Sequence, residues 1–386
     1  MFRASVEHRQ DSLGVIVAGE ASADLHGANL VKAIRQFNPN ISFVGIGGPK
    51  MKGQGVEALV SASETAVVGL SEVFRKLGNI AKAYLGLSRV LKQFRPSLLI
   101  LIDYPEFNLR LASKAKKYGI PVMYYISPQV WAWRPGRVKK IASVVDRMVC
   151  ILPFEKEFYE KRGLRVDYVG HPLCDIEFPE VSPGEILEEL GLKNNYPVLG
   201  LLPGSRDQEV DSLLPNMVGA VKLLKVRYPN LGCILPLAPT IREDRVEHLV
   251  RDAGVEIRIS RANIYELLSC CHCALVASGT ATLEAAIMGV PMVVVYKVSP
   301  VTFFLAKRVV RVEHICLVNL VAGYTLVPEL IQDGVTPEEI TQQLINILED
   351  EKNRTKMKKG LEEVREKLGK GGASRRAAEI ALEMIR

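Results

Sequence analysis

The chain has 386 residues, more than a usual single domain, so we expect two domains of ordinary size. Hydrophobic residues make up 48% and charged residues 24% of the sequence, which excludes a disordered or fibrous protein. No stretch reaches the roughly 18 uninterrupted apolar residues of a membrane-spanning helix, and the net charge of +7 favours anionic partners such as nucleotides or phospholipids.

The N-terminal segment and the cysteines predict a cytoplasmic protein. Residues 1–12 are polar and carry Glu7 and Asp11, which fits neither a secretory signal nor an Arg-rich transit peptide. Seven cysteines is an odd number, and disulfides are not expected. The run of Cys and His at residues 270–273 lacks zinc-site spacing, so no metal is expected there. Basic residues are mixed with acidic ones, and nucleic acid is not expected as a partner.

The first half of the chain alternates short apolar runs with helical patterns, which is typical of a doubly wound α/β sheet. Buried parallel strands are predicted at residues 13–18, 41–46, 98–102, 122–126 and 144–151. The loop after the first strand is expected to face a cleft, and its candidate acceptor-side residues are Gly19, Glu20, Ser22 and His26.

Asp103 directly follows the very apolar strand at residues 98–102. Catalytic groups collect at the carboxyl ends of parallel strands, so Asp103 is a candidate general base. An N-cap for the helix that begins near Glu106 explains the same carboxylate equally simply.

Both tryptophans of the chain lie in one loop, at residues 127–134. Trp133 beside Arg134 suits a sugar ring or a lipid phosphate. Burial in the core is the ordinary use of such side chains, and the sequence leaves the two interpretations open.

A proline-containing stretch at residues 171–184 is predicted to link a first domain, residues 1–170, to a second, residues 185–365. Strands of the second domain are predicted at residues 198–202, 233–235, 255–259, 273–276 and 292–296. Helices are predicted at residues 337–348 and 373–385, and the last segment, residues 366–386, is a candidate to cross back to the first domain. Two such Rossmann-like domains would face one cleft with the carboxyl ends of their strands.

Two turns of the second domain are candidate anion sites. Ser278, Gly279 and Thr280 follow a strand and open a helix, where free amides and the helix dipole favour a diphosphate. Glu284, further along that helix, could accept hydrogen bonds from a ribose, although an ordinary capped helix with an exposed glutamate explains the same spacing.

The second of these turns contains Ser205 and Arg206, after the strand at residues 198–202. The guanidinium of Arg206 can bridge phosphate oxygens, whereas a surface arginine at a turn is the ordinary alternative.

The motifs together resemble the lipid-A-disaccharide synthase family, inverting glycosyltransferases of the two-Rossmann (GT-B) architecture. The resemblance spans nearly the whole chain and is carried, in family order, by AGEASAD, FVGIGGPKM, IDYPEFN, SPQVWAWR, LPFEKEFYEKRG, YVGHPL, LLPGSRDQEV, ASGTATLEAA, FFLAKR and NLVAGYTLVPELIQ. The sequence departs from the family pattern at Ala23, where Gly is usual, and at Glu106, where Asp is usual.

The resemblance implies transfer of 2,3-diacylglucosamine from its UDP derivative to 2,3-diacylglucosamine 1-phosphate, which releases UDP and forms a β-1,6 link. By similarity, Asn319 and Glu284 would line the nucleotide side. No Asp-x-Asp occurs, so no metal and no other cofactor is expected. A UDP-sugar epimerase of the same architecture and a non-catalytic nucleotide or lipid-phosphate binding protein are the alternatives. The sequence leaves open whether the protein forms a homodimer.

Such acylated substrates imply a peripheral protein on the cytoplasmic face of the inner membrane. Residues 67–94 carry apolar side chains at helical spacing, edged by cations, which suits an anionic lipid surface. An ordinary core helix has the same pattern. The residues predicted to contact lipid are Val68, Leu70, Val73, Phe74 and Leu77.

Overall fold

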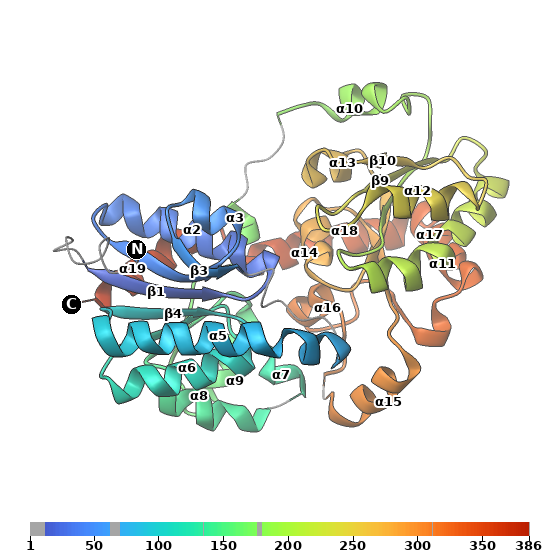
Figure 1. Ribbon diagram of the computed structural model, residues 1–386. Helices are drawn as coiled ribbons and strands as arrows, with labels where there is room; N and C mark the ends of the chain where they lie inside the picture. Colours follow the sequence, from blue (N-terminus) through green and yellow to red (C-terminus); the bar gives the residue numbers. More distant parts are fainter. Residues whose placement is uncertain (1–11, 62–69, 134, 176–179, 311, 386) are drawn as a thin grey trace. The chain divides into compact units, whose positions relative to one another are not determined.

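The computed structural model describes residues 12–61, 70–133, 135–175, 180–310 and 312–385 (Figure 1). The chain forms two compact units. Unit 1 consists of Met1–Asp175 and Gly369–Arg386, and unit 2 of Ile176–Leu368. The stretch predicted as a linker contains the short helix η2 (Pro172–Asp175), which belongs to unit 1, and the start of helix α10 (Pro183–Glu189) in unit 2.

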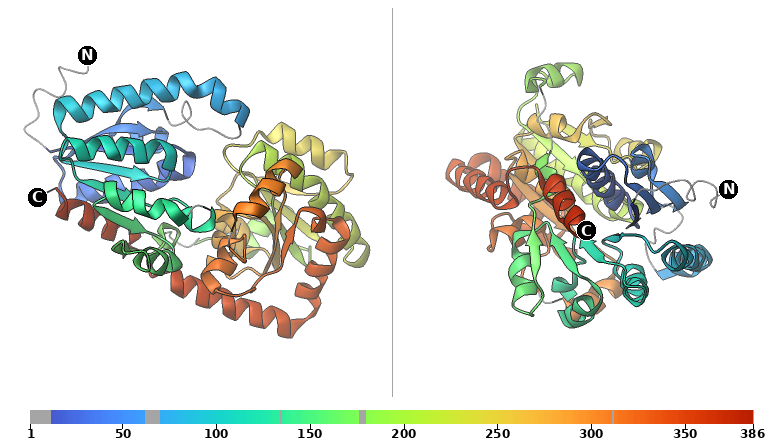
Figure 2. Two further views of the ribbon diagram at one scale, coloured as in Figure 1. Left: turned by 90° about the horizontal axis from the view of Figure 1, so that it is seen from below. Right: turned by 90° about the vertical axis from the view of Figure 1, so that its left-hand side faces the viewer.

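Unit 1 is built on a seven-stranded parallel sheet with the strand order β3-β2-β1-β4-β5-β6-β7. The strands are β1 (Leu13–Ala18), β2 (Ser42–Gly47), β3 (Glu57–Ser61), β4 (Leu98–Ile102), β5 (Val122–Tyr125), β6 (Arg147–Cys150) and β7 (Val166–Tyr168). The helices are α2 (Ala21–Phe37), α3 (Pro49–Gly53), α5 (Leu70–Phe94), α6 (Pro105–Lys117), α7 (Val130–Trp133), η1 (Pro135–Arg137), α8 (Val138–Val144), α9 (Pro153–Glu160) and α19 (Ala373–Glu383). Helices lie on both faces of the sheet (Figure 2), as the predicted doubly wound fold requires.

Unit 2 repeats the architecture with a six-stranded parallel sheet in the order β10-β9-β8-β11-β12-β13. Its strands are β8 (Val198–Leu202), β9 (Gly232–Pro236), β10 (Arg258–Ser260), β11 (Cys273–Ala277), β12 (Met292–Tyr296) and β13 (Glu329–Ile331). Its helices after α10 are α11 (Asp207–Arg227), α12 (Glu243–Arg251), α13 (Ile264–Ser269), α14 (Thr280–Ile287), α15 (Pro300–Val309), α16 (Leu317–Ala322), η3 (Gln332–Gly334), α17 (Pro337–Glu349) and α18 (Glu351–Leu368).

The central strands match the predicted ones because they are apolar along their whole length and fully buried, as β4 shows. Two predictions were wrong in their bounds. Val144 ends α8, so the strand predicted from residue 144 begins at Arg147, and the strand predicted at residues 255–259 is β10, Arg258–Ser260. Strands β3, β7 and β13 were not predicted, because they are short edge strands whose side chains are partly exposed.

The C-terminal helix α19 packs in unit 1, beside α2. Its buried face is made of small residues, which permits close approach: Ala373, Ala377, Ala378 and Ala381. The carboxylate of Asp175 accepts hydrogen bonds from the amides of Ala373 (3.0 Å) and Ser374 (3.2 Å), so it caps the first turn. None of the helices in the described part of the chain combines the length and apolar character that crossing a bilayer requires.

Candidate functional site

The carboxyl edge of the sheet in unit 2 brings two of the predicted turns together. Strands β8 and β11 are neighbours and run parallel, with Leu202 opposite Val276. The loop after β8 contains Ser205 and Arg206, and the loop after β11 contains Ser278 and Gly279. Adjacent parallel strands end at one edge, so these polar turns lie next to each other within a single unit.

The turn after β11 opens helix α14 as predicted. The amide of Ser278 donates to the carbonyl of Val295 (2.9 Å), and its hydroxyl donates to the carbonyl of Ile315 (3.3 Å). A Cβ at Gly279 would meet no atom within 4 Å, so the backbone there borders open space. The amide of Thr282 donates to the carbonyl of Gly279 (3.2 Å). The amides of Thr280 and Ala281, which start the helix, have no acceptor within it, and they suit an anion such as a diphosphate.

The turn after β8 is fixed by Glu209. Gly204 has φ +116°, and a Cβ there would lie 2.7 Å from Cβ of Glu209, so only glycine fits. The Glu209 carboxylate accepts the Ser205 amide (3.0 Å) and pairs with the guanidinium of Arg206 (3.0 Å). Arg206 is half-exposed, so an incoming phosphate would compete with Glu209 for its guanidinium.

Glu284 lies on α14 and is partly buried, not fully exposed. The hydroxyl of Tyr265 donates to its carboxylate at 3.2 Å. Burial raises the pKa of Glu284, which the bond from Tyr265 partly offsets. A tethered carboxylate with further acceptor capacity is suited to a ribose hydroxyl.

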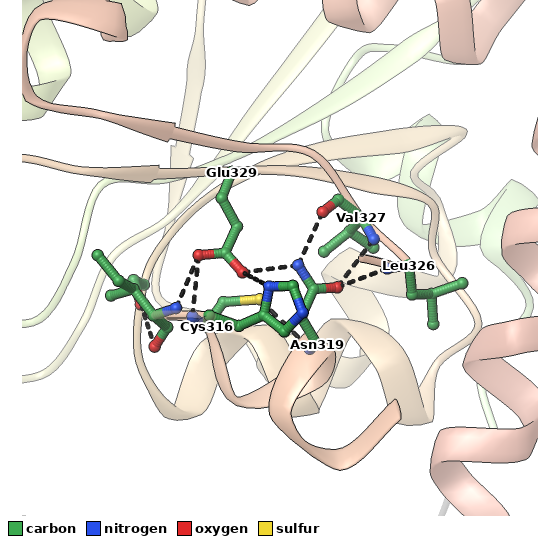
Figure 3. Close-up of polar contacts among 8 residues, drawn as sticks. Cys316, Asn319, Leu326, Val327 and Glu329 are labelled. Carbon is green, nitrogen blue, oxygen red and sulfur yellow. Dashed lines mark hydrogen bonds and ion pairs between the residues drawn. The ribbon is translucent and has the colours of Figure 1, made fainter. Parts of the chain in front are cut away.

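Asn319, expected to line the nucleotide side, is buried, and its amide bonds within its own segment (Figure 3). Its Nδ2 donates to the carbonyl of Val327 (2.9 Å) and to Glu329 (2.6 Å), while its Oδ1 accepts the amides of Leu326 and Val327, both at 2.9 Å. These bonds fill the hydrogen-bonding capacity of the amide. Asn319 therefore holds this segment together, and its place on the nucleotide side stays a prediction.

Glu329, which the sequence did not single out, is the centre of the same network. Its carboxylate accepts the amides of Ile315 (2.8 Å) and Cys316 (3.3 Å) besides the Asn319 amide, and His314 lies 3.6 Å away (Figure 3). Since Ser278 bonds the carbonyl of Ile315, the network ends at the turn that opens α14. The motif NLVAGYTLVPELIQ contains this glutamate, but only the fold shows its partners.

In unit 1, β1 and β4 are neighbours, and the strand order reverses between them. Ligands of such sheets bind outside the carboxyl ends of the strands at this point. The loop with Gly19 and Glu20 follows β1, and Asp103 follows β4, so two of the predicted loops meet here.

Asp103 and Tyr104 both adopt left-handed backbone conformations, with φ of +46° and +48°. The carbonyl of Asp103 accepts the Asn108 side chain (2.6 Å) and the Tyr124 hydroxyl (2.5 Å), and these bonds hold the unusual backbone. Tyr104, and not Asp103, occupies the N-cap position of α6, so the interpretation of Asp103 as the N-cap is wrong. A strained and anchored backbone at a strand end is typical of functional sites.

The residues of the β1 loop fall into two groups. A Cβ at Gly19 would lie 2.7 Å from the Tyr104 ring, so glycine lets the two loops approach each other. Glu20 precedes α2 at the sheet edge, and Ser22 is exposed. His26, in contrast, is buried, and burial followed by Lys50 lowers its pKa to about 4. Its imidazole thus belongs to the interior of unit 1.

The side chain of Asp24 connects the AGEASAD motif to the FVGIGGPKM motif. Its buried carboxylate accepts the amides of Gly48 (2.7 Å), Lys50 (3.0 Å) and Met51 (3.1 Å), which open helix α3. Gly48 has no room for a side chain, since a Cβ would lie 2.8 Å from Cγ of Asp24. These two motifs are linked by capping, independently of any ligand.

The tryptophan loop has a core role for one of its two rings. Trp131 is buried, and its indole donates to Glu155 (3.1 Å), which also accepts the Ser127 hydroxyl (2.6 Å) and the Leu152 amide (3.1 Å). Burial raises the pKa of Glu155 to about 7. The side chain of Trp133 and all of Arg134 lie outside the described residues, so their predicted roles stay predictions.

The predicted lipid-contacting stretch is only partly covered. Val68 lies outside the described residues, as do the side chains of Leu70, Val73, Phe74 and Leu77 at the start of α5. The later part of α5 packs in the core of unit 1 through Leu87 and Leu91. Among the side chains that the structure describes, no group of three or more His, Cys, Asp or Glu is arranged to hold a metal ion.

Comparison with known proteins points to one family. A family model described as lipid-A-disaccharide synthetase matches residues 15–384. The chain is 50% identical over 371 residues to a lipid-A-disaccharide synthase of Geobacter metallireducens, covering 96% of this chain and 97% of that one. It is 47% identical over 371 residues, with the same coverages, to the enzyme of the same name from Geobacter sulfurreducens.

Solved structures share the fold at low sequence identity. The UDP-N-acetylglucosamine 2-epimerase of Neisseria meningitidis bound to UDP-GlcNAc superposes with a TM-score of 0.63 at 14% identity, covering 96% of this chain and 99% of that one. The calicheamicin glycosyltransferase CalG4 gives a TM-score of 0.60 at 15% identity, with coverages of 97% and 98%. The predicted α/β fold class with two parallel sheets is confirmed.

Proposed function

Because the chain belongs to the lipid-A-disaccharide synthase family and is a glycosyltransferase, we propose that it transfers 2,3-diacylglucosamine from its UDP derivative to 2,3-diacylglucosamine 1-phosphate. The observation that carries the proposal is the family match over residues 15–384, which includes every candidate site residue. The products would be UDP and the β-1,6-linked disaccharide 1-phosphate.

The donor would bind at the carboxyl edge of unit 2. Its diphosphate would accept hydrogen bonds from the amides that open α14, beside the open space over Gly279, while Arg206 would leave Glu209 and turn to the phosphates. Glu284 would accept a ribose hydroxyl. As the sugar leaves, negative charge grows on the diphosphate, and these fixed donors stabilise it.

The acceptor would be activated by unit 1. The Asp103 carboxylate would take the proton of the acceptor 6-hydroxyl, whose oxygen attacks the anomeric carbon of the donor sugar. The bond from that carbon to the UDP oxygen breaks on the opposite face, so the configuration inverts. The anchored backbone of Asp103 at the edge of β4 supports this assignment.

The test is turnover with both substrates. UDP should appear only when donor and acceptor are present together, and release from the donor alone, or no release at all, would reject the proposal. Incubation with UDP-N-acetylglucosamine should give no 2-epimer, which excludes the epimerase alternative.

Metal independence belongs to the same proposal. The sequence lacks the Asp-x-Asp pair that would hold a divalent ion against a diphosphate, and Arg206 and the α14 amides offer positive charge instead. Dialysis against EDTA should therefore leave turnover unchanged. A loss of turnover that Mg²⁺ or Mn²⁺ restores would contradict this.

A further inference from the structure

Helix α15 presents apolar side chains to solvent. Val301 is 71% exposed and Phe304 is 58% exposed, and Val310 directly after the helix is 39% exposed. Single exposed apolar residues are common, but a group on one short helix requires an explanation. Val301, Phe304 and Arg308 follow one another at steps of three and four residues, which places them on one side of the helix.

Cations accompany these apolar side chains. The sequence from Lys297 to Val312 contains four Lys or Arg residues and no acidic residue. The Arg308 guanidinium lies 4.1 Å from the centre of the Phe304 ring, so charge and ring form one contact at the surface. We call Val301, Phe304, Lys307, Arg308 and Val310 the α15 surface.

The helix is well defined at its start. Ser299 caps it by accepting the Thr302 amide (3.2 Å), and Pro300 occupies the first turn. Figure 1 shows α15 standing off from the sheet of unit 2. The helix begins shortly after Tyr296, which ends β12, and β12 pairs with β11, the strand before the candidate donor turn. The α15 surface therefore belongs to the carboxyl side of this sheet.

We propose that the α15 surface docks unit 2 on an anionic lipid bilayer. Apolar side chains beside cations match the acyl and phosphate layers of such a bilayer. If this surface instead bound the same surface of a second copy of the chain, Lys307 and Arg308 of the two copies would lie close together. Like charges repel, so such a symmetric contact is disfavoured. The proposal rests on the proposed function, since acylated substrates reside in a bilayer, and it assigns lipid contact to residues other than the predicted stretch at 67–94.

The apolar part is tested with the double variant Val301→Ser and Phe304→Ser. Binding to vesicles of equal parts phosphatidylcholine and phosphatidylglycerol is measured by co-sedimentation without substrates. Loss of a phenylalanine and a valine that insert into the bilayer should weaken binding by about tenfold or more. Val226→Ser is the matched control, because Val226 is an exposed valine of α11 in the same unit, and it should bind like the parent.

The cationic part is tested with Lys307→Gln and Arg308→Gln. Each lost cation should weaken binding to the anionic vesicles about fivefold, and neither should change the weaker binding to pure phosphatidylcholine. Because both side chains are exposed, these variants test the proposal even where the apolar double variant does not fold. Unaltered UDP affinity by calorimetry shows that unit 2 remains intact.

Unchanged vesicle binding in both sets of variants would overturn the proposal. Failure of the parent protein to bind anionic vesicles would overturn it as well. A change of mass in sedimentation velocity without a change in vesicle binding would make the surface a contact between copies, and would also overturn it. Turnover is measured separately with substrates in detergent micelles. If turnover is absent but vesicle binding depends on α15, the docking surface stands and the proposed reaction falls.

Discussion

Asp103 is the residue on which the proposed chemistry depends most. Asp103→Asn keeps the size of the side chain but removes its basicity, and loss of a general base typically lowers turnover by about 10² to 10⁴. Because the backbone carbonyl makes the anchoring bonds to Asn108 and Tyr124, the fold should survive the change. Turnover is measured at saturating substrates, with the thermal midpoint as control. Near-normal turnover would move the role to Glu20, since His26 is buried.

Glu284 makes a separate prediction for donor binding. Glu284→Ala removes one hydrogen bond to a charged group, worth about 1.5–3 kcal/mol, so the affinity for UDP should fall about 10- to 150-fold. Tyr265→Phe is the matched control, since it removes only the bond that tethers the carboxylate and should have a smaller effect. Calorimetric titration with UDP measures both variants. An unchanged dissociation constant in Glu284→Ala would show that the carboxylate does not contact the nucleotide.

Sequence patterns placed some of these residues and missed others for a physical reason. The positions of Arg206 and Ser278 after strands were predictable because a turn after an apolar strand is visible in the local sequence, while their roles stay predictions. Asp24 and Glu329 were not assigned roles, because their partners are backbone amides distant in the chain. Nearly every residue type carries a backbone amide, so a sequence pattern cannot reveal such a partner. The sequence also could not show that the Asn319 amide bonds to Val327, Leu326 and Glu329.

At the scale of elements, Glu329 should position the segment before α16. In Glu329→Gln one acceptor oxygen becomes a donor, which then faces the Asn319 amide or the amides of Ile315 and Cys316. Through the bond from Ser278 to Ile315 this disturbs the donor turn, and UDP affinity should fall about tenfold for a lost hydrogen bond. Turnover at saturating donor should stay near normal, because Glu329 positions the donor turn and does not contact the reacting atoms.

The control for this change is Glu338→Gln, an exposed carboxylate of α17 in the same unit. It should leave UDP affinity unchanged. If Glu329→Gln also binds UDP normally, the network stabilises unit 2 without serving the donor turn.

The elements themselves were predictable to the extent that they are buried. Strands β1, β4 and β11 are surrounded by protein and are apolar throughout, so their positions follow from composition. Strand β13 was missed because Glu329 and its neighbours are half-buried, and their pattern resembles that of a loop. Pairing with β12 makes this segment a strand, and pairing is a tertiary property.

At the scale of the whole molecule, the buried ionisable groups of unit 1 predict how stability depends on pH. Burial lowers the pKa of His26 to about 4 and that of His171 to about 3, whereas burial raises the pKa of Glu155 to about 7. The unfolded histidines take up protons below pH 6.5 while the folded ones stay neutral, so acidification from pH 6.5 destabilises the unit. Glu155 acts in the opposite direction, because above pH 4.5 only the unfolded chain loses its proton.

Each group contributes about 1.4 kcal/mol per pH unit, so two histidines outweigh one carboxyl group. The free energy of unfolding of unit 1 should therefore fall by about 3 kcal/mol between pH 6.5 and pH 4.5. In His26→Leu only the contribution of His171 remains, and it is cancelled by the opposite contribution of Glu155. The fall in the free energy of unfolding between pH 6.5 and pH 4.5 should therefore nearly vanish. Urea unfolding followed by tryptophan fluorescence reports on unit 1, because both tryptophans belong to it. His248→Leu, at an exposed position of α12 in unit 2, should behave like the parent, and an equal fall in His26→Leu would contradict the assignment.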